Sequence, residues 1–165
     1  TIYIGTFSKT FSPAIRLGYM IAPDSLIARI SEVAEKQNIR TEIITQLAMA
    51  DFINEKLLDK HIYKMKKVYA KKRQHIISCI RKYFKDTATI SGENAGLHLL
   101  VSFGSGYCEE AKLLDYGVSA EYADDYATNK LKYKNKLILG YGSLDNNQIE
   151  DGIKNLAQAF QNKLR

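Results

Sequence analysis

The chain has 165 residues, of which 45% are hydrophobic and 25% are charged, and its formal net charge is +6. This composition is ordinary for a soluble globular protein, and the length allows one domain with a core. No apolar run approaches the roughly 20 residues of a membrane-spanning helix, which argues against a membrane protein. The first residues lack the pattern of a secretory signal, so we expect a cytoplasmic location. They include no initiating Met and open in a strand-like run, which suggests a piece of a longer polypeptide.

The first third of the chain predicts two short strands followed by helices. The strands are expected at residues 2–5 and 17–22, the second ending at a proline. Asp24 or Ser25 can cap a helix whose apolar residues recur at helical spacing. Thr41 and Glu42 then start a second helix. Its apolar stripe contains Ile43, Ile44, Leu47, Ala48 and Phe52.

A third, long helix is expected from a cap at Asp59 to about Tyr83. Its inner side is predicted to hold Ile62, Met65, Tyr69, Ile76, Ile80 and Tyr83. Beyond it the pattern favours short strands at 88–90, 97–103, 118–121 and 137–141, and helices at 108–115 and 146–164, the first ending at Gly117. Residues 122–136 read as polar and irregular. Helices on one side of a small, mostly antiparallel sheet give an α+β architecture.

Positive charge is concentrated on the long helix. Residues 60–85 contain ten Lys or Arg and no Asp or Glu, so the remaining residues sum to about −4. Such a stripe could bind DNA phosphates, which makes a basic nucleic-acid-binding module one interpretation. No helix-turn-helix pattern surrounds it. A solvated helix face, with lysine stems covering apolar neighbours, is the simpler interpretation.

The cysteines and histidines do not predict a disulfide, a reactive thiol or a metal site. The two cysteines are too few for a disulfide framework. Cys79 falls among the apolar residues of the long helix and is expected to be a buried small hydrophobe. Cys108, near a predicted helix start, is expected to have no function. His61, His75 and His98 lack metal-ligand spacing, so we expect no metal site.

Lys9 is the candidate catalytic residue. It lies on a predicted turn, with the hydroxyls of Thr6 and Ser8 before it and Arg16 after it. A lysine amine can form a Schiff base with a phosphorylated aldehyde cofactor, while hydroxyls and a guanidinium hold the phosphate. Two plainer interpretations remain open: Lys9 and Arg16 as surface charges, and the hydroxyls as turn residues bonding their own backbone. Pro13 predicts an ordered loop rather than a helix between Lys9 and Arg16.

The segment from Tyr3 to Tyr19, YIGTFSKTFSPAIRLGY, resembles the pyridoxal phosphate (PLP) lysine segment of fold type I aminotransferases of class I/II. It is most similar to the aminotransferase-like domain of MocR-type regulators of the GntR family. Weaker similarities run through the rest of the chain. They comprise Gln46-Leu47-Ala48, His61, Ile62, Met65, Tyr69, Arg73, Gly96-Leu97-His98-Leu99, Leu139-Gly140-Tyr141 and residues 150–153.

The resemblance implies a division of the chain and a set of roles. Residues 1–22 would be the end of the large PLP-binding domain, and residues 23–165 the small C-terminal domain. Lys9 would be the Schiff-base lysine, with Thr6, Ser8 and Arg16 holding the phosphate. The chain would belong to an effector-sensing domain of a regulator. A genuine aminotransferase is the alternative, in which Lys9 would also move the Cα proton.

The resemblance also implies partners. A small-molecule amine or amino acid would be the effector, the longer parent protein would be a homodimer, and DNA would bind only through a winged-helix domain ahead of this chain. Two departures weaken catalysis by the chain alone. The arginine that clamps a substrate carboxylate in many relatives is replaced by Ile138. The carboxylate partner of the cofactor's ring nitrogen lies upstream in the family, and only eight residues precede Lys9.

Overall fold

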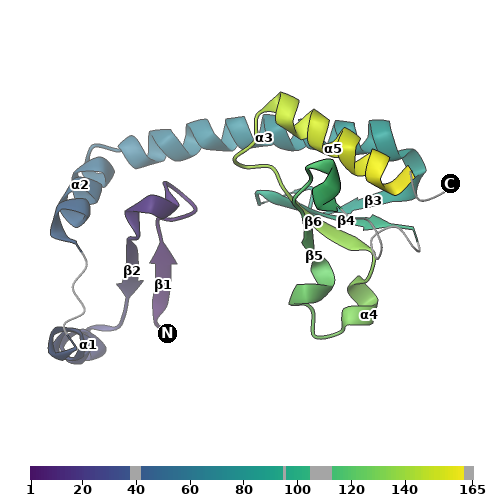
Figure 1. Cartoon of the computed structure of the whole chain (residues 1–165). Coiled ribbons are helices and arrows are strands. Elements are labelled where there is room, and N and C mark those ends of the chain that lie inside the picture. The colour runs from purple at the N-terminus through teal and green to yellow at the C-terminus, as the bar shows by residue number, and fades with distance from the viewer. Residues whose placement is uncertain (38–41, 95, 105–112, 162–165) are drawn as a thin grey trace. The chain divides into compact units, whose positions relative to one another are not determined.

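The computed structural model describes residues 1–37, 42–94, 96–104 and 113–161. The chain divides into two compact units, residues 1–66 and 67–165 (Figure 1). Helix α3 (Leu57–Phe84) begins in the first unit and ends in the second. Among the described residues, no helix combines the length and apolar character that crossing a bilayer requires.

The first unit opens with an antiparallel hairpin. Strands β1 (Tyr3–Thr6) and β2 (Gly18–Ile21) pair along their whole length, from Tyr3 opposite Ile21 to Thr6 opposite Gly18. The connection contains a single 3-10 turn, η1 (Pro13–Ile15), as expected from a proline that removes one backbone donor. Helices α1 (Asp24–Lys36) and α2 (Ile43–Asn54) follow.

Two predicted helix caps are wrong. Pro23, not Asp24 or Ser25, is the N-cap of α1, and no side chain caps that helix. The proline's fixed φ suits entry into a helix, and Asp24 still lies in the first turn, where a carboxylate is favourable beside the helix dipole. Asp59 lies within the first turn of α3 rather than before it.

Helix α2 is capped by Glu42. Its carboxylate accepts hydrogen bonds from the backbone N–H groups of Ile44, at 2.9 Å, and Thr45, at 2.7 Å. The Thr45 hydroxyl donates to the same carboxylate. The hydrogen bond from the Thr45 hydroxyl makes the largest contribution to lowering the pKa of Glu42, and the backbone N–H groups add to it, because all three favour the charged carboxylate. Thr41, predicted to share this role, lies outside the described residues.

The second unit is a four-stranded sheet with helices on one face, which confirms the predicted α+β class (Figure 1). The strand order is β3–β4–β6–β5, and every neighbouring pair is antiparallel. The strands are β3 (Ala88–Ser91), β4 (His98–Phe103), β5 (Glu121–Tyr122) and β6 (Lys136–Gly140). The end of α3 and helix α5 (Asn146–Gln161) pack on the sheet.

The connections of this unit differ from their predicted form. Of the helix expected at 108–115, residues 108–112, with Cys108, lie outside the described part, and Leu113–Tyr116 form a 3-10 turn, η3. Gly117 ends that turn at φ 69°, as its predicted role requires. Strand β5 has only two residues. The segment expected to be irregular contains η4 (Ala123–Tyr126) and the short helix α4 (Lys130–Tyr133). Helix η2 (Lys85–Thr87) links α3 to β3.

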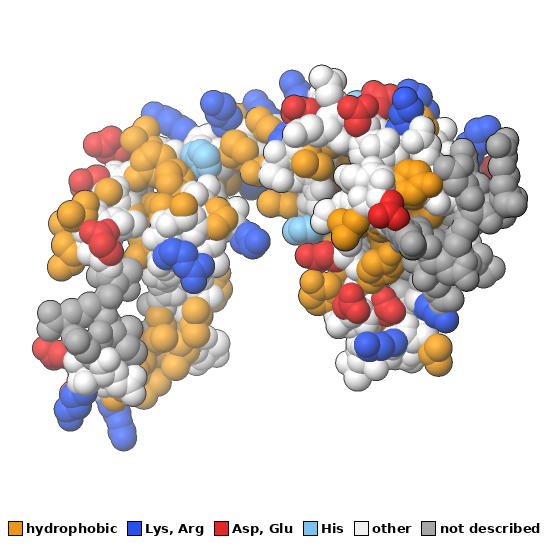
Figure 2. All heavy atoms as spheres, in the orientation of Figure 1, with side chains coloured by type: hydrophobic (Ala, Val, Ile, Leu, Met, Phe, Trp, Pro, Cys, Tyr) orange, Lys and Arg blue, Asp and Glu red, His pale blue; other side chains and the backbone are white. Residues whose placement is uncertain are grey.

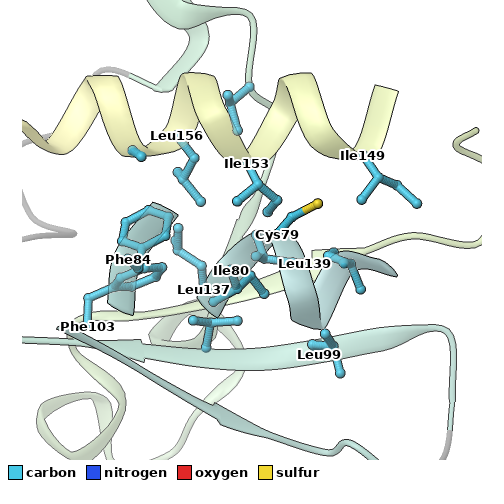
Figure 3. Packing of buried hydrophobic residues seen from close by; sticks show 14 of the residues in the cluster. Cys79, Ile80, Phe84, Leu99, Phe103, Leu137, Leu139, Ile149, Ile153 and Leu156 are labelled. Atoms are coloured by element: carbon cyan, nitrogen blue, oxygen red, sulfur yellow. The ribbon is translucent and has the colours of Figure 1, made fainter. Parts of the chain in front are cut away.

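The core lies between the sheet and the two helices (Figure 3). Leu99, Val101 and Leu137 are fully buried from the sheet side. Ile80 of α3 and Leu156 of α5 meet them and are each 1% exposed. The buried thiol of Cys79 belongs to the same cluster, which confirms its predicted role, and burial raises its pKa.

Three phenylalanine rings close one end of this core. The centroids of Phe84 and Phe103 are 5.0 Å apart, as are those of Phe103 and Phe160. The Phe84–Phe160 distance is 5.8 Å, with the rings edge to face. Such aromatic pairs are each worth about 0.5–1.5 kcal/mol beyond their buried area. The triad therefore joins α3, β4 and α5 directly.

Polar contacts fix the segment that follows β6. Tyr141 is fully buried, and its hydroxyl donates to the Gly96 carbonyl at 2.6 Å. Lys72 Nζ donates to the Gly142 carbonyl at 2.9 Å. Burial raises the pKa of Tyr141 because the ionised phenol would lose its hydration. The first bond ties the end of β6 to the segment before β4, and the second ties it to α3.

Leu99→Ala should lower the free energy of unfolding of the second unit by about 2–5 kcal/mol, because it removes buried methyl groups from a closed core. Leu131→Ala is the matched control: that leucine is 83% exposed, and its loss should change stability by about 0.5 kcal/mol at most. Urea denaturation followed by circular dichroism measures both. Equal shifts of the two midpoints would contradict the assigned core.

Candidate functional site

The candidate site is the loop of residues 7–17 between β1 and β2. The loop is closed at its base by the backbone N–H of Phe7, which donates to the Leu17 carbonyl at 3.0 Å. Leu17 is buried and anchors the returning chain. Arg16 adopts the left-handed conformation, φ 47° and ψ 37°, immediately before it. The closure therefore brings Arg16 back to the end of the strand that carries Thr6.

The hydroxyls of Thr6 and Ser8 lie together at this base. Thr6 Oγ1 is 3.0 Å from Ser8 Oγ, and the Ser8 backbone N–H donates to Thr6 Oγ1 at 3.2 Å. The second bond is the turn interaction that threonines commonly make, so the plainer interpretation of Thr6 is present in the structure. The Thr6 hydroxyl itself donates to Ser8 Oγ, and it also lies 3.4 Å from the Leu17 carbonyl, so its hydrogen would have to turn away from these acceptors to reach a ligand.

Lys9 is exposed at the next turn of the loop. That turn is held by the Phe11 N–H, which donates to the Phe7 carbonyl at 2.8 Å, and by the Thr10 hydroxyl, which donates to the same carbonyl at 3.4 Å. Within the described part of the chain, neither Lys9 nor Arg16 forms an ion pair. The structure thus joins Thr6 with Ser8 and returns Arg16 to the loop base, while the Lys9 side chain extends from the turn.

Phe11 positions the loop, a role that the sequence pattern does not reveal. Its ring contacts Phe52 of α2, with centroids 5.2 Å apart, and His61 of α3, at 5.3 Å. On the hairpin, the Tyr19 ring packs on Phe7 at 5.3 Å. That ring lies over Gly5, where a Cβ would come within 2.3 Å of Tyr19 Cζ. A glycine opposite a large aromatic is the one sequence signal for this packing.

The donor set suits a phosphorylated aldehyde. Two hydroxyls and an arginine guanidinium are groups that bind phosphate oxygens, and an exposed lysine amine can react with a carbonyl carbon. Acidic and sulfur ligands are lacking: among the described residues no group of three or more His, Cys, Asp or Glu could hold a metal ion. The chemistry of the loop is therefore that of anion binding beside an amine.

Ile138 is the residue that the sequence resemblance predicts at the place of a carboxylate-binding arginine. It lies on β6, directly opposite Leu100 of β4, and is half-buried. An apolar side chain here offers no charge to a carboxylate, so this strand position does not supply a clamp.

Comparisons with known proteins match nearly the whole chain. The family model "Aminotransferase class I and II" matches residues 1–119. An uncharacterized HTH-type transcriptional regulator, YhdI of Bacillus subtilis, is 34% identical over 162 residues, which cover 96% of this chain and 34% of that protein. The probable rhizopine catabolism regulatory protein MocR of Rhizobium meliloti is 27% identical over 168 residues, covering 96% and 33%. The chain spans about a third of the length of these regulators.

Solved aminotransferases share the fold. The multiple substrate aminotransferase of Thermococcus profundus superposes with a TM-score of 0.83 at 21% identity, over 99% of this chain and 41% of that one. Kynurenine aminotransferase of Pyrococcus horikoshii gives 0.83 at 22% identity, with the same coverage. The lysine loop, the α+β second unit and the family match agree, and the chain belongs to the class I and II aminotransferase family, with MocR-type regulators among its relatives.

Proposed function

We propose that the chain is the C-terminal part of a PLP-binding, aminotransferase-like domain that senses an effector in a MocR-type transcriptional regulator. The observation that carries the proposal is the extent of the match. Proteins named as transcriptional regulators match 96–97% of the chain at 27–34% identity. The alternative, a genuine class I/II aminotransferase, is supported by fold similarity at 22% identity or less.

Family membership implies pyridoxal phosphate, which when bound supplies an electron sink for bonds at the carbon next to an amine. We assign Lys9 to hold the cofactor through its aldehyde carbon. The Lys9 Nζ would also be the group that takes a proton from the Cα of a bound amine. Thr6 and Ser8 would donate their hydroxyl hydrogens to the phosphate, and Arg16 would bind it through paired N–H groups.

The hairpin supports a boundary near residue 22, with residues 1–22 ending the large PLP-binding domain and residues 23–165 forming the small domain. Apolar side chains of both strands face solvent: Ile4 is 72% exposed and Ile21 61%, and Figure 2 shows hydrophobic side chains gathered on the surface of this unit. Exposed apolar patches of this kind mark surfaces that other protein covers. With a boundary near residue 22, the rest of the large domain would cover this patch.

The partners follow from the same assignment. A small amine or amino acid would be the effector, the longer parent would form a homodimer, and DNA would bind through an N-terminal domain outside this chain. The relatives' description as HTH-type regulators supports the last point.

In the longer parent protein, Lys9→Ala should abolish the visible absorbance of bound PLP, because no other described residue has a matching context. Arg16→Ala should weaken PLP retention roughly ten- to 150-fold, the loss expected for one charge-assisted phosphate contact of about 1.5–3 kcal/mol. Arg29→Ala, which removes an exposed arginine of α1, is the control. Equilibrium dialysis and absorbance titration measure retention. If the Arg16 and Arg29 variants retained PLP equally, the phosphate role of Arg16 would be wrong.

The 165-residue chain by itself should not transaminate, because the family places the carboxylate partner of the cofactor's ring nitrogen upstream of the lysine. The assay follows amino-group transfer from a panel of amines to pyruvate or 2-oxoglutarate with added PLP. The Lys9→Ala chain gives the background of free PLP. Turnover above that background would show that the chain contains a complete catalytic site.

The chain should bind duplex DNA only weakly and without sequence preference. Of the ten basic residues of α3 and its end, Lys72 is bonded to the Gly142 carbonyl, Lys82 pairs with Glu150 at 2.7 Å, and Arg81 with Glu93 at 3.5 Å. The other exposed lysines attract phosphates through a salt-sensitive term that carries no base readout. Fluorescence anisotropy with two unrelated duplexes, titrated with salt, measures this. Tight binding at physiological salt that distinguishes the duplexes would favour a DNA-binding module.

A further inference from the structure

Helix α3 carries a row of exposed lysines on one face. Lys60, Lys64, Lys67 and Lys71 follow one another at spacings of four, three and four residues, and all are exposed. Because an α-helix has 3.6 residues per turn, these spacings place the four side chains on the same face. Figure 2 shows Lys and Arg side chains at intervals along α3. These four residues are called the cationic row below.

The cationic row lies away from the packed side of the helix. Ile62, Met65 and Tyr69 alternate with the lysines and are half-buried, and Ile76 and Ile80 further along are buried. Their spacing puts them on the other side of α3 from the row. The lysine side chains are therefore free of any packing role in the core and can meet a partner from solvent.

Little negative charge neutralises the row. Residues 60–85 contain no Asp or Glu, and the carboxylate next to the row in sequence is Asp59, beside Lys60. In the part of the chain that the structure describes, Lys60, Lys64 and Lys71 take part in none of the ion pairs. The row thus presents positive charge that its own helix does not satisfy.

The positive charge of this face is confined to residues 60–71. The positions that continue the same face are Gln74 and Ser78, which are neutral, and Lys82, which pairs with Glu150 at 2.7 Å. At a rise of 1.5 Å per residue, the row is about 16 Å long. A duplex has one phosphate per 3.4 Å of each strand along its axis, so this length spans roughly five phosphates of one strand.

We propose that the cationic row is a docking surface for the phosphate backbone of duplex DNA. The choice of DNA rests on the function proposed above, in which a separate N-terminal domain holds DNA in the same protein. Tethering through that domain gives a weak surface a high effective concentration of DNA. Phosphate contacts fix position and carry no base readout. The row would therefore add sequence-independent contacts beside the DNA site that the N-terminal domain reads.

The test measures binding of the 165-residue chain to a short fluorescent duplex by anisotropy, between about 20 and 200 mM salt. Changing Lys60, Lys64, Lys67 and Lys71 together to Gln should make the slope of log affinity against log salt shallower by about 3, since each lost phosphate contact removes about 0.9. Changing the same four to Arg should preserve affinity and slope. Gln is a good helix former, so circular dichroism should show unchanged helix content.

The matched control removes the same charge from another basic segment. Changing Lys130, Lys132, Lys134 and Lys136 to Gln should alter the slope by less than about 1. Poly-L-glutamate at equal charge concentration tests an acidic protein as the partner. It should displace little DNA, because a duplex carries one charge per about 1.7 Å and releases more counterions.

Three results would overturn the proposal: no duplex binding at the lowest salt, equal loss of slope in the two Gln variants, or displacement of the duplex by poly-L-glutamate. None of them bears on the sensing function, because PLP retention by the Lys9 and Arg16 variants tests that function separately.

Discussion

The register between β4 and β6 is the constraint on which the second unit depends. It places Leu99 opposite Leu139, Leu100 opposite Ile138 and Val101 opposite Leu137. Because side chains alternate along a strand, a slip of one residue would turn the buried residues Leu99, Val101 and Leu137 outward and Leu100 and Ile138 inward. Burial of the core set against α3 and α5 makes that slip costly, since each large apolar side chain contributes about 1.5–3 kcal/mol when buried. The same register thus places the core residues on one face of the sheet and the half-buried Leu100 and Ile138 on the other.

The lysine loop, residues 7–17, is held mainly by backbone hydrogen bonds, and few of its side chains are buried. One hydrogen bond between Phe7 and Leu17 joins the loop ends, and one aromatic side chain, Phe11, attaches the loop to α2 and α3. The loop therefore keeps its shape although Thr6, Lys9 and Arg16 are exposed. Arg16 is held in the left-handed region, which costs a non-glycine residue free energy and is more common at functional positions than elsewhere.

Charge on α3 serves the fold as well as the surface. Lys72 satisfies a backbone carbonyl after β6, and Lys82 joins α3 to α5 through Glu150. The hydrogen bond from Lys82, with a second from Tyr83, lowers the pKa of Glu150 and so favours its charged form. A count of lysines along the sequence cannot separate these residues from the solvent-facing ones, because the acceptors lie about 70 residues away in the chain.

The sequence by itself determined the family, the α+β class, the long helix and the segment around Lys9, because these follow from local periodicity and a contiguous motif. It also predicted the buried role of Cys79. It did not predict the Pro23 cap, the two-residue β5, the order within residues 122–136 or the anchoring of Phe11. The two-residue β5 and the anchoring of Phe11 depend on contacts between residues distant in sequence. The Pro23 cap and the turns within residues 122–136 are local features that the residue pattern did not signal. The hollow of about 750 Å³ that Leu100, Ile138 and Lys132 line is the clearest case, because only the pairing of β4 with β6 and the return of α4 bring these residues together.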